Sequence, residues 1–302
     1  MMTRREAICL LSYGSIAALA TTKTGFNPVR GGYAAAKDDP IPPLAPGAPA
    51  SPERMALIEA FKKQSSGLEK KFEARTHKSD WVMPYRLFRP EAAGKLPLVV
   101  FLHGSAGLGN DNEKQLGLGN IFGTRVWLLP ENQKRFSCYV VAPQTDRGWI
   151  KYDLSQQTEG PAKVLSGFGD GNRLAMEIVD KLCRELPIDQ SRIYVTGQSM
   201  GGAGVWNLIA QRPKFFAAAV ICCGSTSTET GIEAIETPLW DFHGDSDKSV
   251  PVSTSRDRIA ARRKAGGRPF YTEYAGVDHN CWQWAYTEPE LVKWVFAQRR
   301  AK

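Results

Sequence analysis

The residues best suited to covalent chemistry lie in the segment from Val195 to Gly202, which reads Val-Thr-Gly-Gln-Ser-Met-Gly-Gly. Ser199 stands there between Gly197 and Gly201, in a Gly-x-Ser-x-Gly pattern. A serine on a sharp turn between a strand and a helix has strained backbone, and glycines avoid collisions that side chains would cause. The residues before the turn resemble a short buried strand and those after it a helix. Ser199 is therefore a candidate nucleophile, although the same pattern also occurs in simple tight turns.

A serine nucleophile needs a base within hydrogen-bond reach and an acid that fixes the tautomer of that base. Asp247 is the favoured acid, because the Lys-Ser-Val-Pro sequence that follows it completes a recurrent loop pattern. Asp245 stands two residues earlier and remains an alternative. His279, in the sequence Gly-Val-Asp-His-Asn, is the only histidine after this acidic loop. We therefore predict that His279 is the base.

The other three histidines of the chain have different surroundings. His103 and His243 each precede a glycine within an expected turn, where an imidazole more often holds loop backbone than transfers a proton. His77 lies in a polar stretch and is expected at the surface.

These residues must be held by a regular framework, and apolar periodicity predicts alternating strands and helices. The expected strands are Trp81–Phe88, Leu96–Leu102, Cys138–Ala142, Arg192–Thr196, Phe216–Cys223, Pro238–Phe242 and Phe270–Tyr274. The expected helices are Pro52–Phe72, interrupted near Ser65, then Asn172–Leu186, Gly202–Arg212, Ser253–Ala265 and Glu288–Gln298.

Continuous apolar strands that alternate with helices predict an α/β fold with a mostly parallel central sheet covered on both faces. Asp247 and His279 each follow a predicted strand. Such sheets carry their sites at the carboxyl ends of the strands. The two residues are therefore expected at the same edge as Ser199.

Several motifs together resemble the secreted esterase branch of the α/β-hydrolase superfamily over roughly Trp81 to Gln298. This branch is similar to feruloyl and acetyl-xylan esterases, polyhydroxybutyrate-depolymerase-like esterases, and predicted peptidases related to prolyl oligopeptidase. The motifs are Leu102-His103-Gly104-Ser105, Asp111-Asn112-Glu113, Ala142-Pro143-Gln144, Gly197-Gln198-Ser199-Met200-Gly201-Gly202, Phe242-His243-Gly244 through Val250-Pro251, and Asp278-His279-Asn280-Cys281-Trp282.

The resemblance implies an α/β-hydrolase fold and a catalytic triad of Ser199, His279 and Asp247. It also implies an oxyanion hole made by the backbone amides of Met200 and Ser105. One departure from the pattern is Asp278, where glycine is common. Its carboxylate could raise the pKa of His279 or point into solvent.

The substrate is harder to predict. The segments 143–171 and 224–237 are too short for a large helical lid, which favours an open cleft for bulky esters. Trp149, Trp282 and Trp284 lie near the predicted site and either stack on a sugar or aryl group or pack the loops. Trp149, Trp282 and Gln198 are the predicted substrate-binding residues.

Composition narrows the possible partners. The chain has 302 residues and a net charge of +8, but its basic residues are scattered among acidic ones, which disfavours nucleic-acid binding. Six cysteines form no Cys-x-x-Cys pair, and the histidines are far apart in sequence. We therefore predict no metal and no cofactor. The sequence indicates neither an oligomeric state nor a disulfide pairing.

The N-terminus has the pattern of an export signal. Arg4 and Arg5 precede an apolar run from Ala7 to Ala20 that is too short to span a bilayer. The start resembles a twin-arginine export signal, and export by the Sec route is a close alternative. A third possibility is a short amphipathic segment that stays on the protein. The expected division is a signal and leader over 1–36, a proline-rich linker over 37–52 and a catalytic domain over 53–302.

The sequence thus favours a serine carboxylic-ester hydrolase that forms an acyl-enzyme, acting on acyl or feruloyl esters of polysaccharide or on similar bulky esters. A serine peptidase of the prolyl-oligopeptidase-like type is an alternative, because amide hydrolysis uses the same triad. A non-catalytic binding protein on the same fold is a second alternative, since a fold does not establish a function.

Overall fold

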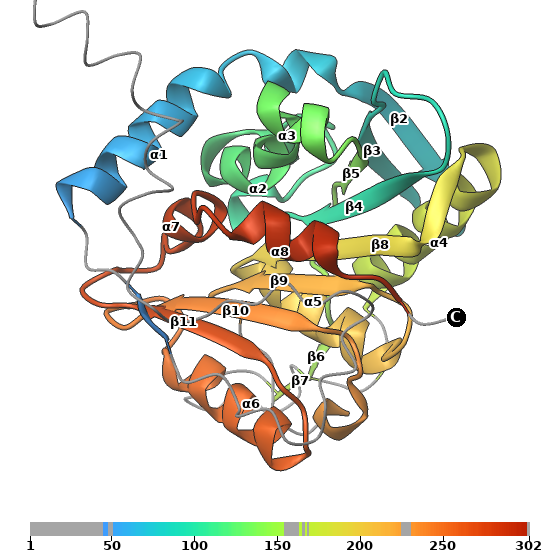
Figure 1. Cartoon of the computed structure of the whole chain (residues 1–302). Helices are drawn as coiled ribbons and strands as arrows, with labels where there is room; N and C mark the ends of the chain where they lie inside the picture. Colours follow the sequence, from blue (N-terminus) through green and yellow to red (C-terminus); the bar gives the residue numbers. More distant parts are fainter. Residues whose placement is uncertain are drawn as a thin grey trace, which may run out of the picture. The chain divides into compact units, whose positions relative to one another are not determined.

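A computed structural model of the chain describes residues 45–47, 51–153, 163–164, 167, 169–224 and 231–300. Within them, the main element is a nine-stranded sheet with the strand order β1-β11-β10-β9-β8-β4-β5-β3-β2 (Figure 1). Its strands are β1 (Ala45–Gly47), β2 (Glu73–Lys78), β3 (Val82–Phe88), β4 (Leu96–Leu102), β5 (Tyr139–Pro143), β8 (Ile188–Gln198), β9 (Ala218–Cys222), β10 (Leu239–Gly244) and β11 (Phe270–Tyr274). Two further short strands, β6 (Tyr152–Asp153) and β7 (Lys163–Val164), pair only with each other.

The strand directions confirm the predicted α/β architecture. β1, β11, β10, β9, β8, β4 and β5 pair in parallel, whereas β2 and β3 join the sheet antiparallel. The parallel strands are apolar on both faces, as expected where helices cover both sides of a sheet. The carboxyl ends of β4, β8, β9, β10 and β11 therefore open onto one edge.

Helices cover both faces of this sheet (Figure 1). One face is covered by α1 (Pro52–Gln64), α2 (Ile121–Arg125), α3 (Pro130–Arg135), α7 (Trp282–Tyr286) and α8 (Leu291–Ala297). The other is covered by α4 (Asp170–Glu185), α5 (Met200–Gln211) and α6 (Ser253–Lys264).

Alternate residues of each strand supply the two cores. In β4, Val99 and Phe101 belong to the cluster with α2 and α8, whereas Leu98 and Val100 belong to the cluster with α4 and α5. This division follows from the two-residue period of a strand. The sheet is consequently anchored on both sides, and its carboxyl edge is a firm base for a site.

Short 3₁₀ helices complete the described fold and gather mainly after β4. They are η2 (Leu68–Lys71), η3 (Ser105–Gly107), η4 (Lys114–Leu116), η5 (Leu118–Asn120), η6 (Val126–Leu128) and η7 (Ile232–Ala234). None of the helices in the described ranges is both long and apolar enough to cross a membrane.

The predicted linker over 37–52 contains one strand that was not predicted, and the predicted start of a helix at Pro52 is confirmed. Ala45–Gly47 pair in parallel with β11, and so extend the sheet by one strand. Pro52 is the first residue of α1, with Ser51 as the N-cap whose side chain accepts from the Arg54 amide. The expected export signal over 1–36 and the rest of the linker lie outside the described residues.

We predicted that no large lid forms, because segments 143–171 and 224–237 are short. Both segments lie partly outside the described residues. Their described parts contain no element larger than β6, β7, η7 and the first turn of α4.

Candidate active site

Ser199 occupies a strained turn between β8 and α5. Its backbone has φ 52° and ψ −121°, a conformation that L residues adopt rarely and that clusters at functional sites. The flanking glycines make the turn possible. A Cβ on Gly197 would lie 2.5 Å from the carbonyl oxygen of Gly201, and one on Gly201 would overlap the carbonyl oxygen of Leu102. The Gly-x-Ser-x-Gly spacing is thus a direct requirement of close backbone packing.

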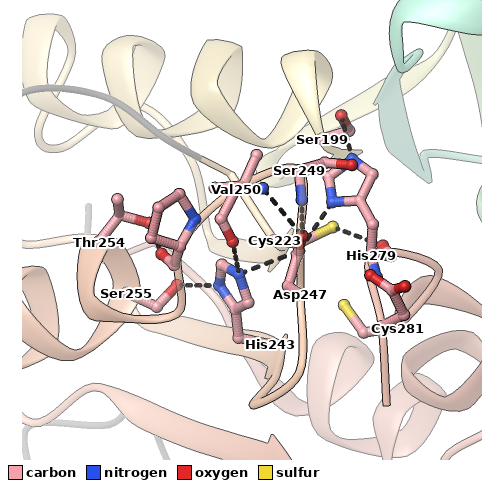
Figure 2. A network of polar contacts seen from close by, with 12 residues as sticks. Ser199, Cys223, His243, Asp247, Ser249, Val250, Thr254, Ser255, His279 and Cys281 are labelled. Atoms are coloured by element: carbon pink, nitrogen blue, oxygen red, sulfur yellow. Dashed lines mark hydrogen bonds and ion pairs between the residues drawn. The ribbon is translucent and has the colours of Figure 1, made fainter. Parts of the chain in front are cut away.

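The structure brings Ser199, His279 and Asp247 into one hydrogen-bonded line (Figure 2). Nε2 of His279 lies 2.8 Å from Oγ of Ser199, and Nδ1 lies 2.7 Å from Oδ2 of Asp247. Asp247 comes from the loop after β10 and His279 from the loop after β11. With the Nδ1 proton held by the carboxylate, the lone pair of Nε2 faces the serine hydroxyl.

The geometry distinguishes the two acids that the sequence left open. Asp247 has a fully buried side chain, and its Oδ1 accepts from the amides of Ser249 and Val250 at 2.8 Å each. Asp245 instead accepts from the Gly276 amide at 2.7 Å and so braces the two loops. Of these two acids, only Asp247 contacts the imidazole of His279.

A second imidazole supports the same carboxylate. Nε2 of His243 lies 3.2 Å from Oδ2 of Asp247 and 3.0 Å from the carbonyl oxygen of Val250. Both of these atoms accept hydrogen bonds, so Nε2 of His243 carries the proton, and Nδ1 accepts from the Ser255 hydroxyl at 2.8 Å. Burial lowers the pKa of His243, which keeps this ring neutral. His243 is a fixed donor that helps to orient Asp247.

The surroundings of His279 favour its charged form. Burial opposes a charge on the ring, but the contacts of His279 with the Cys223 side chain and with the Asp247 carboxylate outweigh burial and raise the pKa of His279 above its usual value. An imidazole stabilised as its cation is a competent proton acceptor.

Met200 and Ser105, the predicted oxyanion donors, both lie at the start of a helix. Met200 is the first residue of α5, where an amide has no partner within the helix. Ser105 is the exposed first residue of η3, and the preceding Gly104 packs against the nucleophile, since a Cβ on Gly104 would lie 3.6 Å from Cβ of Ser199. In the part of the chain that the structure describes, no carbonyl accepts a hydrogen bond from either amide.

The predicted contact between Trp149 and substrate is wrong. The indole is completely buried, and its Nε1 donates to the carbonyl oxygen of His103 at 2.9 Å. His103 in turn donates from Nδ1 to the Gly104 carbonyl at 2.8 Å. Trp149 and His103 therefore fix the backbone of the turn after β4. This confirms the alternative that Trp149 packs the loops and the prediction that His103 holds loop backbone.

Gln198 and Trp282 both lie beside the candidate triad, but their side chains differ in exposure. Gln198 is 2% exposed, and its Oε1 has no hydrogen-bond partner among the described residues. Trp282 is half-buried and stands edge-on to His279, with ring centres 5.4 Å apart. Gly119 packs against the same indole. A substrate contact through Gln198 or Trp282 stays a prediction, whereas Trp284 is mostly buried in the core.

An apolar side chain projects from the loop that contacts Trp282. Leu118 is 73% exposed and has φ 45°, a left-handed conformation that is unusual for leucine. Gly119 next to it contacts Trp282, and Asn120 accepts from the Gly104 amide at 3.1 Å. This tripeptide links the turn that carries Ser105 to the loop that carries His279.

Asp278 and His77 also have defined partners. Oδ1 of Asp278 accepts from the amides of Lys248 and His279 at 3.0 and 2.7 Å, and these bonds lower the pKa of Asp278. The carboxylate thus ties the acid loop to the base loop. His77 is not a free surface residue, because its Nε2 lies 2.8 Å from Oε2 of Glu177.

The described residues also hold free cysteines, at positions 138, 183, 222, 223 and 281. Cys223 directly follows β9 with φ 43°, and its buried Sγ donates to the carbonyl oxygen of His279 at 3.2 Å (Figure 2). Sequence spacing gave no sign of this contact, because 56 residues separate the two positions.

Fold and site together define an α/β-hydrolase. Residues 91–286 match the family model described as phospholipase/carboxylesterase, and the chain belongs to that family. No curated protein matches the chain.

Solved structures give the same result. A thermostable esterase superposes with a TM-score of 0.70 and 36% sequence identity, covering 77% of this chain. This chain spans 64% of the length of that esterase. Esterase PE8 is 18% identical with a TM-score of 0.50, covering 75% of this chain and 97% of its own. The acylaminoacyl peptidase of Pyrococcus horikoshii is 15% identical with a TM-score of 0.54, covering 81% of this chain and 44% of its own. The last two show likeness of fold alone.

Proposed function

We propose that the protein is a serine carboxylesterase that works through an acyl-enzyme. The observation that carries this proposal is the continuous contact from Ser199 through His279 to Asp247, at 2.8 and 2.7 Å. In this reaction Nε2 of His279 takes the hydroxyl proton while Oγ of Ser199 attacks the ester carbonyl carbon. The carbonyl oxygen becomes an oxyanion that accepts from the amides of Met200 and Ser105.

The same groups complete the cycle. The His279 imidazolium gives its proton to the leaving alcohol as the carbon–oxygen bond breaks, which leaves the acyl group on Ser199. Water then attacks the acyl carbonyl with His279 as base, and the returning proton regenerates the serine hydroxyl. Asp247 stays ionised throughout and stabilises the imidazolium.

Esters with an apolar or aryl part, including acyl or feruloyl esters of polysaccharide, are the proposed substrates. Support comes from the half-buried Trp282, which stands edge-on to His279, and from the exposed Leu118, whose neighbour Gly119 packs against the same indole. Peptide hydrolysis on the same triad is the second candidate function, supported only by the likeness of fold to an acylaminoacyl peptidase.

A fluorophosphonate labels only an activated serine, and it tests the proposal directly. We expect one adduct, mapped to Ser199 by peptide mass analysis. Ser199→Ala should give no adduct and should lower turnover of an aryl acetate by about four to six orders of magnitude. A folded wild-type protein without an adduct, or a fully active Ser199→Ala variant, would contradict the proposal.

The substrate class needs a separate comparison. Release of acetate or ferulate from acylated xylan is measured beside hydrolysis of short aryl esters and of a peptide anilide. We expect the acylated polysaccharide to compete with the aryl ester. Hydrolysis of the small esters alone would reject the polysaccharide, and preferred cleavage of the anilide would favour the peptidase.

We also propose that the protein is exported, on the basis of Arg4, Arg5 and the short apolar run that follows. N-terminal sequencing of the protein made in a bacterial host tests this. A mature chain that still begins at Met1 in the cytoplasmic fraction would contradict it.

A further inference from the structure

Cys223 lies behind the candidate triad, where the proposed ester hydrolysis gives it no role. Its Sγ, a carboxylate oxygen of Asp247 and a ring nitrogen of His279 all lie within 4.8 Å of one another. They come from the ends of three neighbouring strands, β9, β10 and β11, which explains why the sequence did not reveal the grouping of Cys223 with the other two. We propose that these three side chains form an inhibitory binding site for a thiophilic divalent cation such as Zn²⁺ or Cd²⁺.

The backbone at Cys223 orients its side chain. Its φ of 43° is a left-handed conformation that glycine adopts freely and that costs free energy for a residue with a side chain. The Cys223 amide donates to the Phe242 carbonyl at 2.8 Å, and this fixes the turn. The strained turn aims the thiol at the base loop, as its contact with the His279 carbonyl demonstrates (Figure 2).

The donor set determines which ions fit. Zinc binds thiolate sulfur at about 2.3 Å and imidazole nitrogen or carboxylate oxygen at about 2.0 to 2.2 Å, in tetrahedral geometry. Ligand atoms of such a site are about 3 to 4 Å apart. The three ligand atoms here lie within 4.8 Å of one another, and the pair of Nδ1 and Oδ2 at 2.7 Å must separate slightly to admit an ion. Magnesium and calcium prefer oxygen ligands alone. The site therefore selects Zn²⁺ or Cd²⁺ over Mg²⁺ and Ca²⁺.

Binding at this place would remove the base from the reaction. The cation takes the position of the proton between Nδ1 of His279 and Oδ2 of Asp247, which are 2.7 Å apart before it enters. The ring proton moves from Nδ1 to Nε2, and the Cys223 thiol releases its proton to solvent. Nε2 then has no free lone pair for the proton of Ser199.

The three ligands of the proposed site differ in exposure. Cys223 is completely buried and so is the Asp247 side chain, but the His279 side chain is 22% exposed. His279 is therefore the first ligand that an ion from solvent would meet.

The first test is inhibition by metal chloride salts in buffer without chelator or thiol. Wild type, Cys223→Ser and Cys183→Ser are titrated with Zn²⁺, Cd²⁺ and Mg²⁺ during hydrolysis of an aryl acetate, each rate being divided by that variant's own rate without metal. We expect Zn²⁺ and Cd²⁺ to inhibit wild type and Cys183→Ser alike, with reversal by EDTA. The Cys223→Ser variant should need at least about tenfold more metal.

The second test does not depend on ester hydrolysis. Cd²⁺ is titrated into Ser199→Ala, and we expect one equivalent to bind with the ultraviolet absorption of a cadmium thiolate. Ser199→Ala/Cys223→Ser should lack this signal, and Ser199→Ala/Asp247→Asn should bind more weakly. The same signal in Ser199→Ala/Cys223→Ser, or equal inhibition of wild type and Cys223→Ser, would overturn the site. An inactive wild type that still gives the cadmium signal would reject only the proposed function.

Discussion

Asn120 holds the turn that carries one candidate oxyanion amide. Its Oδ1 accepts from the Gly104 amide at 3.1 Å, across 16 residues of chain. The amide group of Asn120 also donates to the Lys114 carbonyl at 3.2 Å, so both ends of this side chain are fixed. Since Gly104 packs against Ser199, a shift of Asn120 would move the Ser105 amide relative to the nucleophile.

Asn120→Ala should therefore lower kcat more than it changes KM. We expect a loss of about tenfold to a hundredfold, smaller than the loss from removing an oxyanion donor itself. Steady-state kinetics on an aryl ester measure the change. Asn132→Ala is the matched control, because Asn132 in α3 likewise donates to a backbone carbonyl, that of Val126 in η6. An unchanged kcat in Asn120→Ala would mean that Gly104 needs no such support.

Asp247→Asn should abolish the correct tautomer of His279. An amide nitrogen facing Nδ1 favours the ring form whose proton lies on Nε2, and the expected fall in kcat is about ten-thousandfold, as in serine proteases with the same triad. Asp245→Asn is the control, since its Oδ1 can still accept from the Gly276 amide. It should retain most activity. Equal losses in the two variants would contradict the assignment of the acid.

The positions of the strands along the chain were the most predictable part of the fold. β11 spans Phe270–Tyr274, as predicted from five residues of strand-forming type, and β4 spans Leu96–Leu102. β8 begins at Ile188, four residues before the predicted start at Arg192, because Ile188 already pairs with Leu96 ahead of an irregularity in the register. The polar residues between Ile188 and Ile193 interrupt the apolar run, so periodicity locates only the second part of the strand.

The region after β4 was not predictable in the same way. Between residues 105 and 135 the chain forms six short helices of three to six residues each, too few to set up an apolar period. The supporting contacts of the site span long distances in sequence. Trp149 packs in the apolar core, and its buried indole donates to the carbonyl of His103, 46 residues away. Asn120 is another residue that sequence reasoning missed, because its link to Gly104 leaves no local signal.

Gly201→Ala should prevent stable folding. A Cβ at this position would overlap the Leu102 carbonyl oxygen, which is backbone in the central strand and has no room to move. The expected loss is above about 3 kcal/mol in the free energy of unfolding, measured by urea denaturation, or a loss of soluble protein. Gly117→Ala is the control. Its φ is −98° and its new Cβ would meet only the Lys114 carbonyl at 3.7 Å, so a change within about 0.5 kcal/mol is expected.

His103 should make the fold sensitive to mild acid. The ring is fully buried between the Gly104 carbonyl, 2.8 Å from Nδ1, and the Thr145 amide, which donates to Nε2 at 3.1 Å. Burial lowers the pKa of His103 to about 4, against the weaker opposing effects of the Gly104 carbonyl and Asp111. Protonation of Nε2 would also remove the acceptor that the Thr145 amide requires.

The sign of the effect follows from proton uptake. In the unfolded chain His103 titrates near its ordinary pKa of about 6.5, so between about pH 6.5 and pH 4 the unfolded state binds more protons than the folded state. Its contribution to stability is complete above pH 6.5 and falls by up to about 3 kcal/mol as the pH drops to 4. Urea unfolding across this range measures the slope. His103→Asn has no titrating group at this position, and its stability should fall less steeply with acid than that of wild type. Parallel curves for the two proteins would show that other groups cause the acid sensitivity.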